Sequence, residues 1–259
     1  MKILAIIGSP RKKGNTYHVV EQIKEHLLEY DKSIDFEYLF LRDYNLQMCT
    51  GCFICIGQGE NKCPLKDDRM LIQARMSEAE GIIYAAPTYA KGVPGLMKNF
   101  IDRFAHTCHR PDFFDKVFLT VTTIGASKGM ELTLEQLAVL TGGGRLAGKL
   151  GVPSPPIAMA GYAKKAKKNI EKASKAFYTA LNKKDKKLPG VEEWAWFHSF
   201  KSLCSLEDYQ KICPADYAYY KEKKEYFYQI NGHIIRRMFG KLFGSVMRLS
   251  FGFIIKKKK

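Results

Sequence analysis

Five short apolar runs alternate with helix-length amphipathic segments over about the first 160 residues of the chain. The runs occupy residues 2–7, 36–41, 81–86, 116–122 and 145–150, and the segments between them include 15–29, 67–78, 92–105 and 129–141. Runs of this kind are typical of parallel strands covered on both faces, since each face must then be hydrophobic. With right-handed crossovers, the pattern predicts an α/β fold: a three-layer sandwich around a five-stranded parallel sheet.

Three connections of this expected fold have the composition of ligand-binding loops. Ligands of an open parallel sheet bind beyond the carboxyl ends of the strands, where the winding direction reverses. The connections expected there are 8–15, 87–95 and 123–128, and they are rich in Gly, Pro, Ser, Thr and Asn. Because such residues let the backbone approach a ligand closely, we expect these three loops to form the binding site.

The first of these loops, Gly8–Thr16, is suited to hold a phosphate group. It connects an apolar strand to a helix, so its backbone N–H groups and the positive end of the helix dipole converge on one point. Ser9 and Thr16 add hydroxyl donors, Asn15 adds an amide, and Arg11 can form a charge-assisted contact with a dianionic phosphate monoester. Neither the Walker A nor the GxGxxG pattern is present, which leaves a phosphate loop of another kind or a simple tight turn.

The loop sequence Gly-Ser-Pro-Arg-x-x-Gly-Asn-Thr resembles the FMN-phosphate loop of the NAD(P)H-dependent FMN reductase and flavodoxin-like quinone reductase superfamily. The resemblance continues at Ala-Pro-Thr-Tyr (86–89) and at Gly-Val-Pro-Gly-Leu-Met-Lys-Asn-Phe-Ile-Asp-Arg (92–103), and it spans about residues 1–150. It implies a flavodoxin-like sheet of strand order 2-1-3-4-5. It also implies that the stretch 98–103 makes a subunit or core contact.

The resemblance implies a set of FMN-binding residues. Those expected at the phosphate are Ser9, Arg11, Gly14, Asn15 and Thr16; those expected at the flavin ring and ribityl chain are Pro87, Thr88, Tyr89 and Ala90; those expected at the other edge of the ring are Thr123, Ile124 and Gly125. For Tyr89, ordinary packing is an equally good interpretation. Such a site holds FMN next to NAD(P)H or an acceptor, and no obligatory catalytic acid or base is named because the flavin supplies the chemistry. His106 and His109 could line the pocket, although surface or core histidines are more common.

Four cysteines lie within fifteen positions of one another: Cys49, Cys52, Cys55 and Cys63. In a reducing compartment, thiolates at this density favour metal ligation or redox chemistry over structural disulfides. Consecutive two-residue gaps favour a [4Fe-4S] cluster over zinc, which more often uses two separated Cys-x2-Cys pairs. The spacing resembles that of iron-sulfur flavoproteins, a branch of the same superfamily. Zinc, and thiols without a metal, stay open as alternatives. The isolated Cys108, Cys204 and Cys213 are interpreted as packed side chains.

The net charge of +16 is concentrated in two segments. Residues 163–187 carry ten Lys against two acidic residues, a net +8, and residues 221–259 carry eleven Lys and Arg against two, a net +9. The remainder of the chain therefore sums to −1, so the predicted catalytic part is not basic and nucleic acid is not expected as a partner. We expect a flavodoxin-like domain at 1–183, ending in a Lys-rich helix over 161–183, and a helical extension at 184–259.

The extension combines aromatic groups with a basic amphipathic helix. We interpret the aromatics as a packed core rather than as a base-stacking surface; they are Trp194, Trp196, Phe197, Phe200, Tyr217, Tyr219, Tyr220, Tyr226 and Tyr228. From Ile234 onward, apolar pairs recur every four residues and form one helical stripe, with basic residues off it. This segment, 231–259, could pack on a neighbouring subunit or on the sheet, or lie on an anionic membrane. No signal peptide or spanning segment is recognisable, so a cytoplasmic protein with an optional membrane contact is expected.

Together these features predict an FMN-dependent oxidoreductase that passes electrons from NAD(P)H to a quinone, a flavin or another small acceptor. An iron-sulfur cluster could take part in that transfer. The alternative is an iron-sulfur flavoprotein that carries electrons for a ferredoxin-type protein partner. The family resemblance also implies a homo-oligomer.

Overall fold

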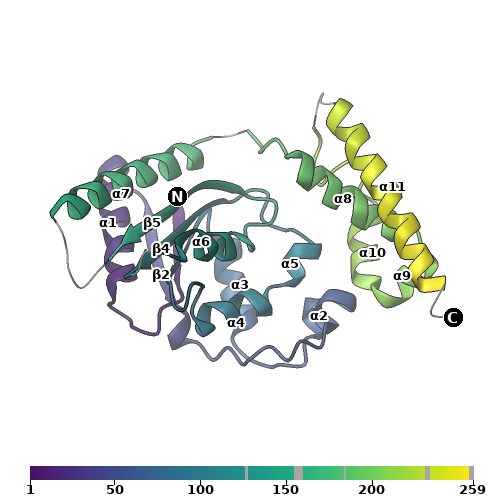
Figure 1. Ribbon diagram of the computed structural model, residues 1–259, viewed down its shortest axis with the longest axis horizontal. Coiled ribbons are helices and arrows are strands. Elements are labelled where there is room, and N and C mark those ends of the chain that lie inside the picture. Colours follow the sequence, from purple (N-terminus) through teal and green to yellow (C-terminus); the bar gives the residue numbers. More distant parts are fainter. Residues whose placement is uncertain (126–127, 155–159, 184, 231–233, 257–259) are drawn as a thin grey trace. The chain divides into compact units, whose positions relative to one another are not determined.

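The computed structural model describes residues 1–125, 128–154, 160–183, 185–230 and 234–256, and the chain divides into two structural units. One unit comprises Met1–Thr50 and Leu65–Lys186, and the other comprises Gly51–Pro64 and Lys187–Lys259. The segment 51–64, with three of the four clustered cysteines, thus groups with the C-terminal part of the chain (Figure 1). Among the described residues, no helix is long and apolar enough to cross a membrane.

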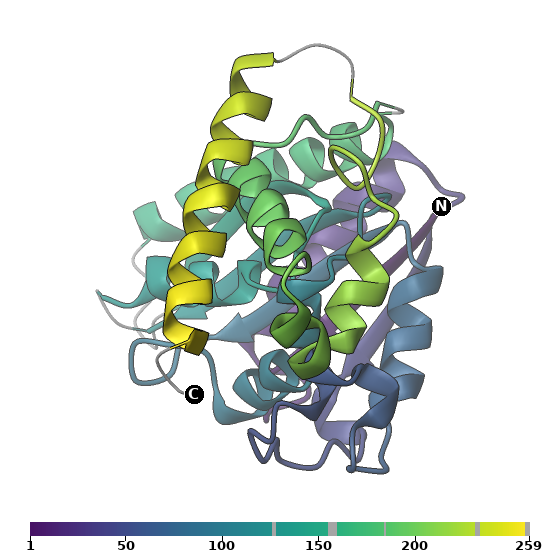
Figure 2. The same cartoon turned by 90° about the vertical axis from the view of Figure 1, so that its right-hand side faces the viewer.

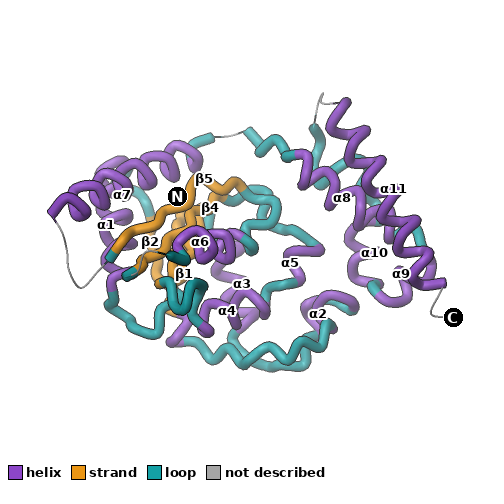
Figure 3. The backbone as a smooth tube through the Cα atoms, in the orientation of Figure 1, coloured by secondary structure: helices purple, strands orange, loops and turns teal. Residues whose placement is uncertain are grey.

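The first unit is built on a five-stranded sheet of order β2-β1-β3-β4-β5 in which every pair is parallel. Its strands, drawn in orange in Figure 3, are β1 (Lys2–Ile7), β2 (Asp35–Phe40), β3 (Gly81–Pro87), β4 (Val117–Ile124) and β5 (Arg145–Pro153). Both β3 and β4 are buried along their whole length, because helices cover both of their faces. The predicted flavodoxin-like fold and strand order are confirmed.

Helices cover the sheet in two layers (Figure 1). On one face, α1 (Asn15–Tyr30) and α7 (Ala160–Leu181) pack on alternate strand residues such as Ile3 and Ala5. On the other, α3 (Arg69–Glu78), α4 (Gly95–Arg103) and α6 (Met130–Ala138) pack on the intervening ones, such as Leu4 and Ile6. The short elements of this unit are η1 (Leu41–Asp43) and α5 (His106–His109).

Several element boundaries differ from those predicted, and the differences concern the binding loops. Strand β3 continues to Pro87 and β4 to Ile124, so these residues end strands rather than open loops. Helix α4 begins at Gly95 rather than near residue 92, because Tyr89 and Gly92 exchange two backbone hydrogen bonds of 2.8 and 3.0 Å and so form a separate turn. The helix starts only after Pro94, whose ring fixes the backbone just before the first turn.

The second unit is helical. Its elements are α2 (Ile54–Gly57), η2 (Glu60–Lys62), α8 (Val191–Leu203), α9 (Glu207–Ile212), α10 (Pro214–Tyr220) and α11 (Ile234–Lys256). Within this unit, α2 packs against α10 and α11 runs alongside α8, as Figures 1 and 2 show. The aromatic core predicted for the extension forms around buried side chains, including Trp194, Phe197 and Tyr220. Trp196 and Tyr217 are exceptions, because they lie on exposed helix faces.

A buried histidine lies between α8 and α11. His198 is 5% exposed and stacks on Trp194, and among the residues that the structure describes its Nε2 atom has no hydrogen-bond partner. Burial lowers the pKa of His198 to about 4, and the neighbouring cations Lys241, Lys201 and Arg237 contribute in the same direction. The imidazole is therefore neutral in the folded unit at neutral pH.

This histidine predicts that the second unit loses stability in mild acid. The unfolded chain binds a proton at His198 near pH 6.5, whereas the folded chain binds it only near pH 4, so stability is complete above about pH 6.5 and falls as the pH drops. Between about pH 7 and about pH 5 we expect a loss of about 2 kcal/mol at most, roughly 5 °C in the melting temperature. Tryptophan fluorescence reports this unit alone, since both tryptophans, Trp194 and Trp196, belong to it.

The control for this prediction is the variant His198→Asn, whose side chain does not titrate. Its melting temperature is expected to change less over the same pH range than that of the native chain. Equal pH slopes for the two proteins would show that His198 is not the titrating group.

Candidate functional site

A pocket of about 450 Å³ opens at the carboxyl ends of the strands in the first unit. It is lined by Ser9, Arg11, Gly14, Asn15, Thr16, Pro87, Thr88, Tyr89, Thr123, Ile124, Gly125 and Ser154. Eleven of the twelve residues predicted from the sequence thus line one cavity. Ala90 is not among the lining residues, and Ser154, which follows β5, was not predicted. A volume of this size is in the range of small-molecule and cofactor sites.

One end of the pocket is formed by the loop between β1 and α1. Gly8 donates a backbone hydrogen bond to Ala85 at 2.8 Å, and a Cβ atom at Gly8 would lie 2.6 Å from Met97, so only glycine lets the loop start here. The loop then turns, with the Arg11 N–H donating to Ser9 Oγ at 3.1 Å. Helix α1 begins after Gly14, with no side-chain capping hydrogen bond and no acidic residue in its first turn. The positive end of its dipole therefore faces the pocket without a protein carboxylate to offset it.

Arg11 extends from this loop across the pocket. Its guanidinium lies 3.5 Å from the hydroxyl of Tyr89, which is 38% exposed, so Tyr89 is a pocket residue rather than a core residue. The outer side of the loop is held by other cations: Arg42 donates to the Pro10 carbonyl at 2.6 Å, and Lys12 pairs with Asp43. Arg11 is thus left facing the cavity, where it can contact an anionic ligand.

The turn that carries Tyr89 has an unusual backbone. Ala90 and Lys91 both have positive φ angles, 47° and 67°, as in type I′ turns, although neither is glycine. Helix α6 holds this turn in place: Gln136 accepts a 2.9 Å hydrogen bond from the Val93 N–H, and Gly129 packs so closely that a Cβ there would lie 2.7 Å from Lys91 Cα. Strained turns of this kind persist where surrounding contacts enforce them, often at ligand sites.

Threonine hydroxyls connect the walls of the pocket. Thr16 and Thr123 are hydrogen-bonded at 2.7 Å, which ties the first turn of α1 to the end of β4. Thr88 shares a 3.0 Å hydrogen bond with Thr122 and donates another, also of 3.0 Å, to Thr133 on α6. These bonds fix the side chains on either side of the cavity, so the pocket is preformed.

The pocket's chemistry matches the parts of FMN. An uncapped helix N-terminus with hydroxyl donors and an arginine suits a phosphate monoester. The ends of β3 and β4, where backbone atoms can approach a ligand, and the side chain of Tyr89 suit the flat flavin ring, which needs close contacts and few charges around it. His106 and His109, considered as pocket residues, do not line it, and His106 is buried.

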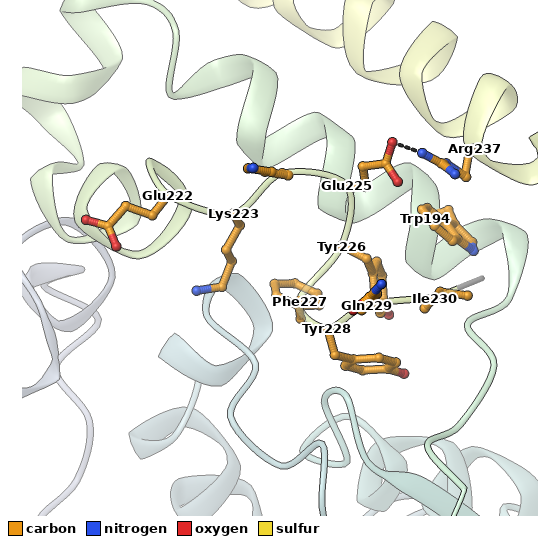
Figure 4. A pocket seen from close by; sticks show the side chains of 11 residues that line it. Trp194, Glu222, Lys223, Glu225, Tyr226, Phe227, Tyr228, Gln229, Ile230 and Arg237 are labelled. Atoms are coloured by element: carbon orange, nitrogen blue, oxygen red, sulfur yellow. Dashed lines mark ion pairs between the residues drawn. The ribbon is translucent and has the colours of Figure 1, made fainter. Parts of the chain in front are cut away.

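A larger pocket, of about 740 Å³, lies within the second unit (Figure 4). Its wall is the stretch 222–230 together with Trp194 of α8 and Arg237 of α11. Arg237 is ion-paired with Glu225, and Lys223 donates to the Tyr219 carbonyl at 2.8 Å. The described residues that line this pocket include no glycine-rich loop at a helix N-terminus, so the smaller pocket is the better flavin site.

The four clustered cysteines lie in segments of both units. Cys49, in the first unit, donates its backbone N–H to Asn99 Oδ1 at 2.9 Å and is partly buried. In the second unit, Cys52 is exposed, Cys55 lies in α2, and Cys63 follows η2. Among the described residues, no three His, Cys, Asp or Glu side chains are grouped closely enough to hold a metal ion.

In the stretch 98–103, Asn99 and Arg103 make core contacts, whereas Lys98 is exposed. Asn99 donates to the carbonyls of Leu46 and Gln47 at 3.0 and 3.2 Å, and Arg103 donates to the Gln47 carbonyl at 2.7 Å. Both side chains are buried on α4. They therefore hold the backbone that leads to Cys49 against the first unit.

Arg103 also forms a buried ion pair with Asp67. Burial by itself would raise the pKa of Asp67, but hydrogen bonds from Arg103 and from the N–H groups of Arg69 and Gln47 outweigh it, and the pKa lies below its usual value. The carboxylate is thus charged at neutral pH and fully hydrogen-bonded.

Comparison with known proteins agrees with this geometry. The sequence model of the family described as NADPH-dependent FMN reductase matches residues 1–150, a range that contains the phosphate loop, the Tyr89 turn and the ends of β3 and β4. The chain belongs to this family. It is therefore an NAD(P)H-dependent FMN oxidoreductase, with FMN as its cofactor and NAD(P)H as its reductant.

Curated relatives carry a more specific name. An iron-sulfur flavoprotein of Methanocaldococcus jannaschii is 37% identical over 139 residues, which are 53% of this chain and 69% of the relative. An iron-sulfur flavoprotein of Clostridioides difficile is 30% identical over 190 residues, which are 71% of this chain and 81% of the relative.

Solved structures share the fold. An NAD(P)H:quinone oxidoreductase from Methanothermobacter marburgensis is 14% identical, with a TM-score of 0.52, and the match covers 71% of this chain and 99% of that one. At this identity the likeness shows the flavodoxin-like fold alone.

Proposed function

We propose that the chain transfers electrons from NAD(P)H, through FMN held in the 450 Å³ pocket, to a [4Fe-4S] cluster and a small acceptor such as a quinone or a flavin. The observation that carries the flavin part is the convergence of eleven predicted residues on one cavity at the strand ends. The cluster part is supported by the cysteine spacing and by relatives named iron-sulfur flavoproteins.

In this proposal the protein binds and orients the flavin. Ser9, Asn15, Thr16 and the first-turn N–H groups of α1 hold the phosphate, and Arg11 offsets its charge. Pro87, Thr88 and Tyr89 form one wall for the ring, with Ala90 shaping the turn, and Thr123, Ile124 and Gly125 form the other wall. When bound, FMN supplies hydride acceptance and one-electron transfer.

Cys49, Cys52, Cys55 and Cys63 are the proposed cluster ligands. Thiolates are the ligands that iron-sulfur clusters take, and the donor set contains four within one connection. Zinc and thiols without a metal are the competing occupants of the same residues. The hydrogen bond from the Cys49 N–H to Asn99 anchors one end of the connection, which supports a fixed role for it.

If the four cysteines hold a cluster, replacing one of them should remove iron without removing FMN. We expect anaerobically purified native protein to contain about four iron and four sulfide per chain beside one FMN. Cys55→Ser is expected to lose most of the iron and the broad visible absorption. It is expected to keep FMN, because Cys55 is not among the residues that line the flavin pocket and lies outside the loops that form it. Metal analysis and visible spectra measure both quantities.

The matched control is Cys108→Ser, since Cys108 lies outside the cluster motif and is exposed, in contrast to the packed position expected from the sequence. It is expected to keep iron and flavin alike. Reconstituted native protein that holds zinc, or no metal at all, would contradict the cluster while leaving the flavin site intact.

A second candidate is an iron-sulfur flavoprotein that carries electrons for a ferredoxin-type protein, and the relatives named iron-sulfur flavoproteins support the cluster that it requires. Rapid mixing distinguishes the two. Fast bleaching of the flavin by NADH or NADPH supports the reductase with a small acceptor, whereas bleaching only by reduced ferredoxin supports the carrier.

We further propose that the protein is a cytoplasmic homo-oligomer. Light scattering of the holoprotein measures the number of chains in the assembly.

A further inference from the structure

Two glycines of helix α11, Gly240 and Gly244, lie directly against α8. A Cβ atom at Gly240 would lie 2.7 Å from His198 Cδ2, and one at Gly244 would lie 2.5 Å from the His198 carbonyl oxygen. Only glycine allows the two helix backbones this close approach. The side of α11 that carries Gly240 and Gly244 is therefore the side that faces α8. The two helices run next to each other in Figures 1 and 2.

The opposite side of α11 is apolar and exposed. We call it the outer stripe; it consists of Ile235, Met238, Phe239, Leu242, Val246 and Leu249. With 100° between successive residues, these positions centre roughly 180° away from the two glycines. Every member is at least half exposed, from 52% for Val246 to 79% for Ile235. The sequence pattern predicted an apolar stripe of the pairs 234/235, 238/239, 242/243 and 246/247, and five of the six outer-stripe residues belong to these pairs. Packing within the second unit does not cover the outer stripe.

A contiguous apolar stripe of this length is unusual on a surface that faces only water, so it indicates a partner. The charges around the stripe indicate which one. Residues 226–259 contain eight Lys and Arg and no Asp or Glu. Lys241 and Arg248 are exposed on α11, whereas Arg237 is ion-paired with Glu225 (Figure 4). Two copies of such a helix repel each other, but an anionic surface attracts it.

We propose that α11 binds an anionic phospholipid surface, with the outer stripe in the interfacial region of the bilayer. The helix lies parallel to the membrane plane, because its apolar residues form one side rather than a spanning segment. Lys241 and Arg248 contact lipid phosphates, and the glycine side stays on α8. The residues 231–233 and 257–259, which belong to the predicted contact segment, lie outside the described part of the chain.

Flotation of the FMN-loaded protein with lipid vesicles tests the proposal. We expect the native protein to float with phosphatidylserine/phosphatidylcholine vesicles and to bind phosphatidylcholine vesicles at least about tenfold more weakly. The double variant Leu242→Gln/Val246→Gln is expected to bind the anionic vesicles at least about tenfold more weakly than the native protein, since it removes two inserted side chains. Both residues are exposed, so the fold does not depend on them.

Ile212→Gln is the matched control, because Ile212 is an equally exposed apolar residue of the same unit but lies on α9. It is expected to bind vesicles like the native protein. Equal binding of all three proteins would overturn the proposal, as would equal binding to neutral and anionic vesicles. A native assembly that separates in the double variant without lipid, seen by light scattering, would also overturn it, because a second copy would then cover the stripe.

Discussion

Replacing Gly14 by Asp is expected to weaken FMN binding by about 100-fold or more while leaving the flavin-free protein at least as stable as before. Gly14 is the N-cap of α1, with φ −87° and ψ −178°, the extended conformation that capping Asp residues adopt. The nearest atom to a Cβ there would be Arg11 Cβ at 3.4 Å, so the side chain fits. Its carboxylate would accept hydrogen bonds from the first-turn N–H groups of α1 and would offset the positive end of the helix dipole. The proposed site would then have neither to offer to the phosphate.

Gly14→Asn separates these two effects. The amide caps the helix in the same way but adds no charge, so we expect a loss of about tenfold in FMN affinity rather than about 100-fold. Titration of flavin-free protein with FMN, followed by quenching of flavin fluorescence, measures the affinity, and far-UV circular dichroism measures the melting temperature. Native-like affinity in both variants would place the phosphate elsewhere.

The proposed phosphate site was predictable because its parts are contiguous in the sequence. A strand, a glycine-containing loop and a helix follow one another within residues 2–30, and the backbone geometry of such a unit depends little on the rest of the chain. That Pro87 and Thr123 lie at the binding edge of the sheet was predictable for a similar reason, because apolar runs locate parallel strands and parallel strands end at one edge, although both strands extend further than predicted.

The remaining pocket contacts depend on tertiary packing that the sequence pattern does not reveal. Thr133 and Gln136 reach the Tyr89 turn from α6, more than forty positions away, and each looks like an ordinary polar helix residue. Ser154 was missed because β5 extends to Pro153, three residues beyond its predicted end. For the pocket contact of Thr122, the only signal in the sequence was the alternation of threonines along β4.

In the C-terminal extension, too, features that are local in the sequence were predictable, whereas tertiary contacts were not. The periodicity from Ile234 predicted α11, and the aromatic density predicted a core, because both are local properties of the sequence. Which side of α11 would be buried was not predictable from hydrophobicity, since two glycines lie at the contact with α8 and the outer stripe is exposed. The grouping of residues 51–64 with the extension likewise arises from tertiary contacts, and the predicted boundary at 183/184 stays a prediction.

Replacing Arg103 by Met is expected to destabilise the first unit by about 3–5 kcal/mol, because it leaves the Asp67 carboxylate buried without its counter-ion. It also removes the hydrogen bond to the Gln47 carbonyl that helps to hold the backbone before Cys49. Far-UV circular dichroism during urea unfolding measures the loss; tryptophan fluorescence does not, since both tryptophans are in the second unit.

The pH dependence should reverse in this variant. In the native chain the pKa of Asp67 is lowered, so its contribution to stability is present above the unfolded pKa of about 3.9 and is lost as the pH falls. Burial is the largest single influence on Asp67, so without Arg103 we expect its pKa to rise above that of the unfolded chain. The Arg103→Met variant should then regain part of its stability on acidification, where the native chain loses it.

Lys98→Met is the matched control on the same helix. Lys98 pairs with Asp102 at 2.5 Å, but both side chains are largely exposed, so water screens the pair and its loss should cost less than about 0.5 kcal/mol. Adding Asp67→Asn to Arg103→Met removes the stranded charge and keeps an oxygen acceptor for one of the two backbone N–H groups, those of Gln47 and Arg69, that the carboxylate accepts from. This double variant should therefore be more stable than Arg103→Met alone. If Lys98→Met and Arg103→Met are equally destabilising, burial of the Asp67–Arg103 pair does not determine the stability of this unit.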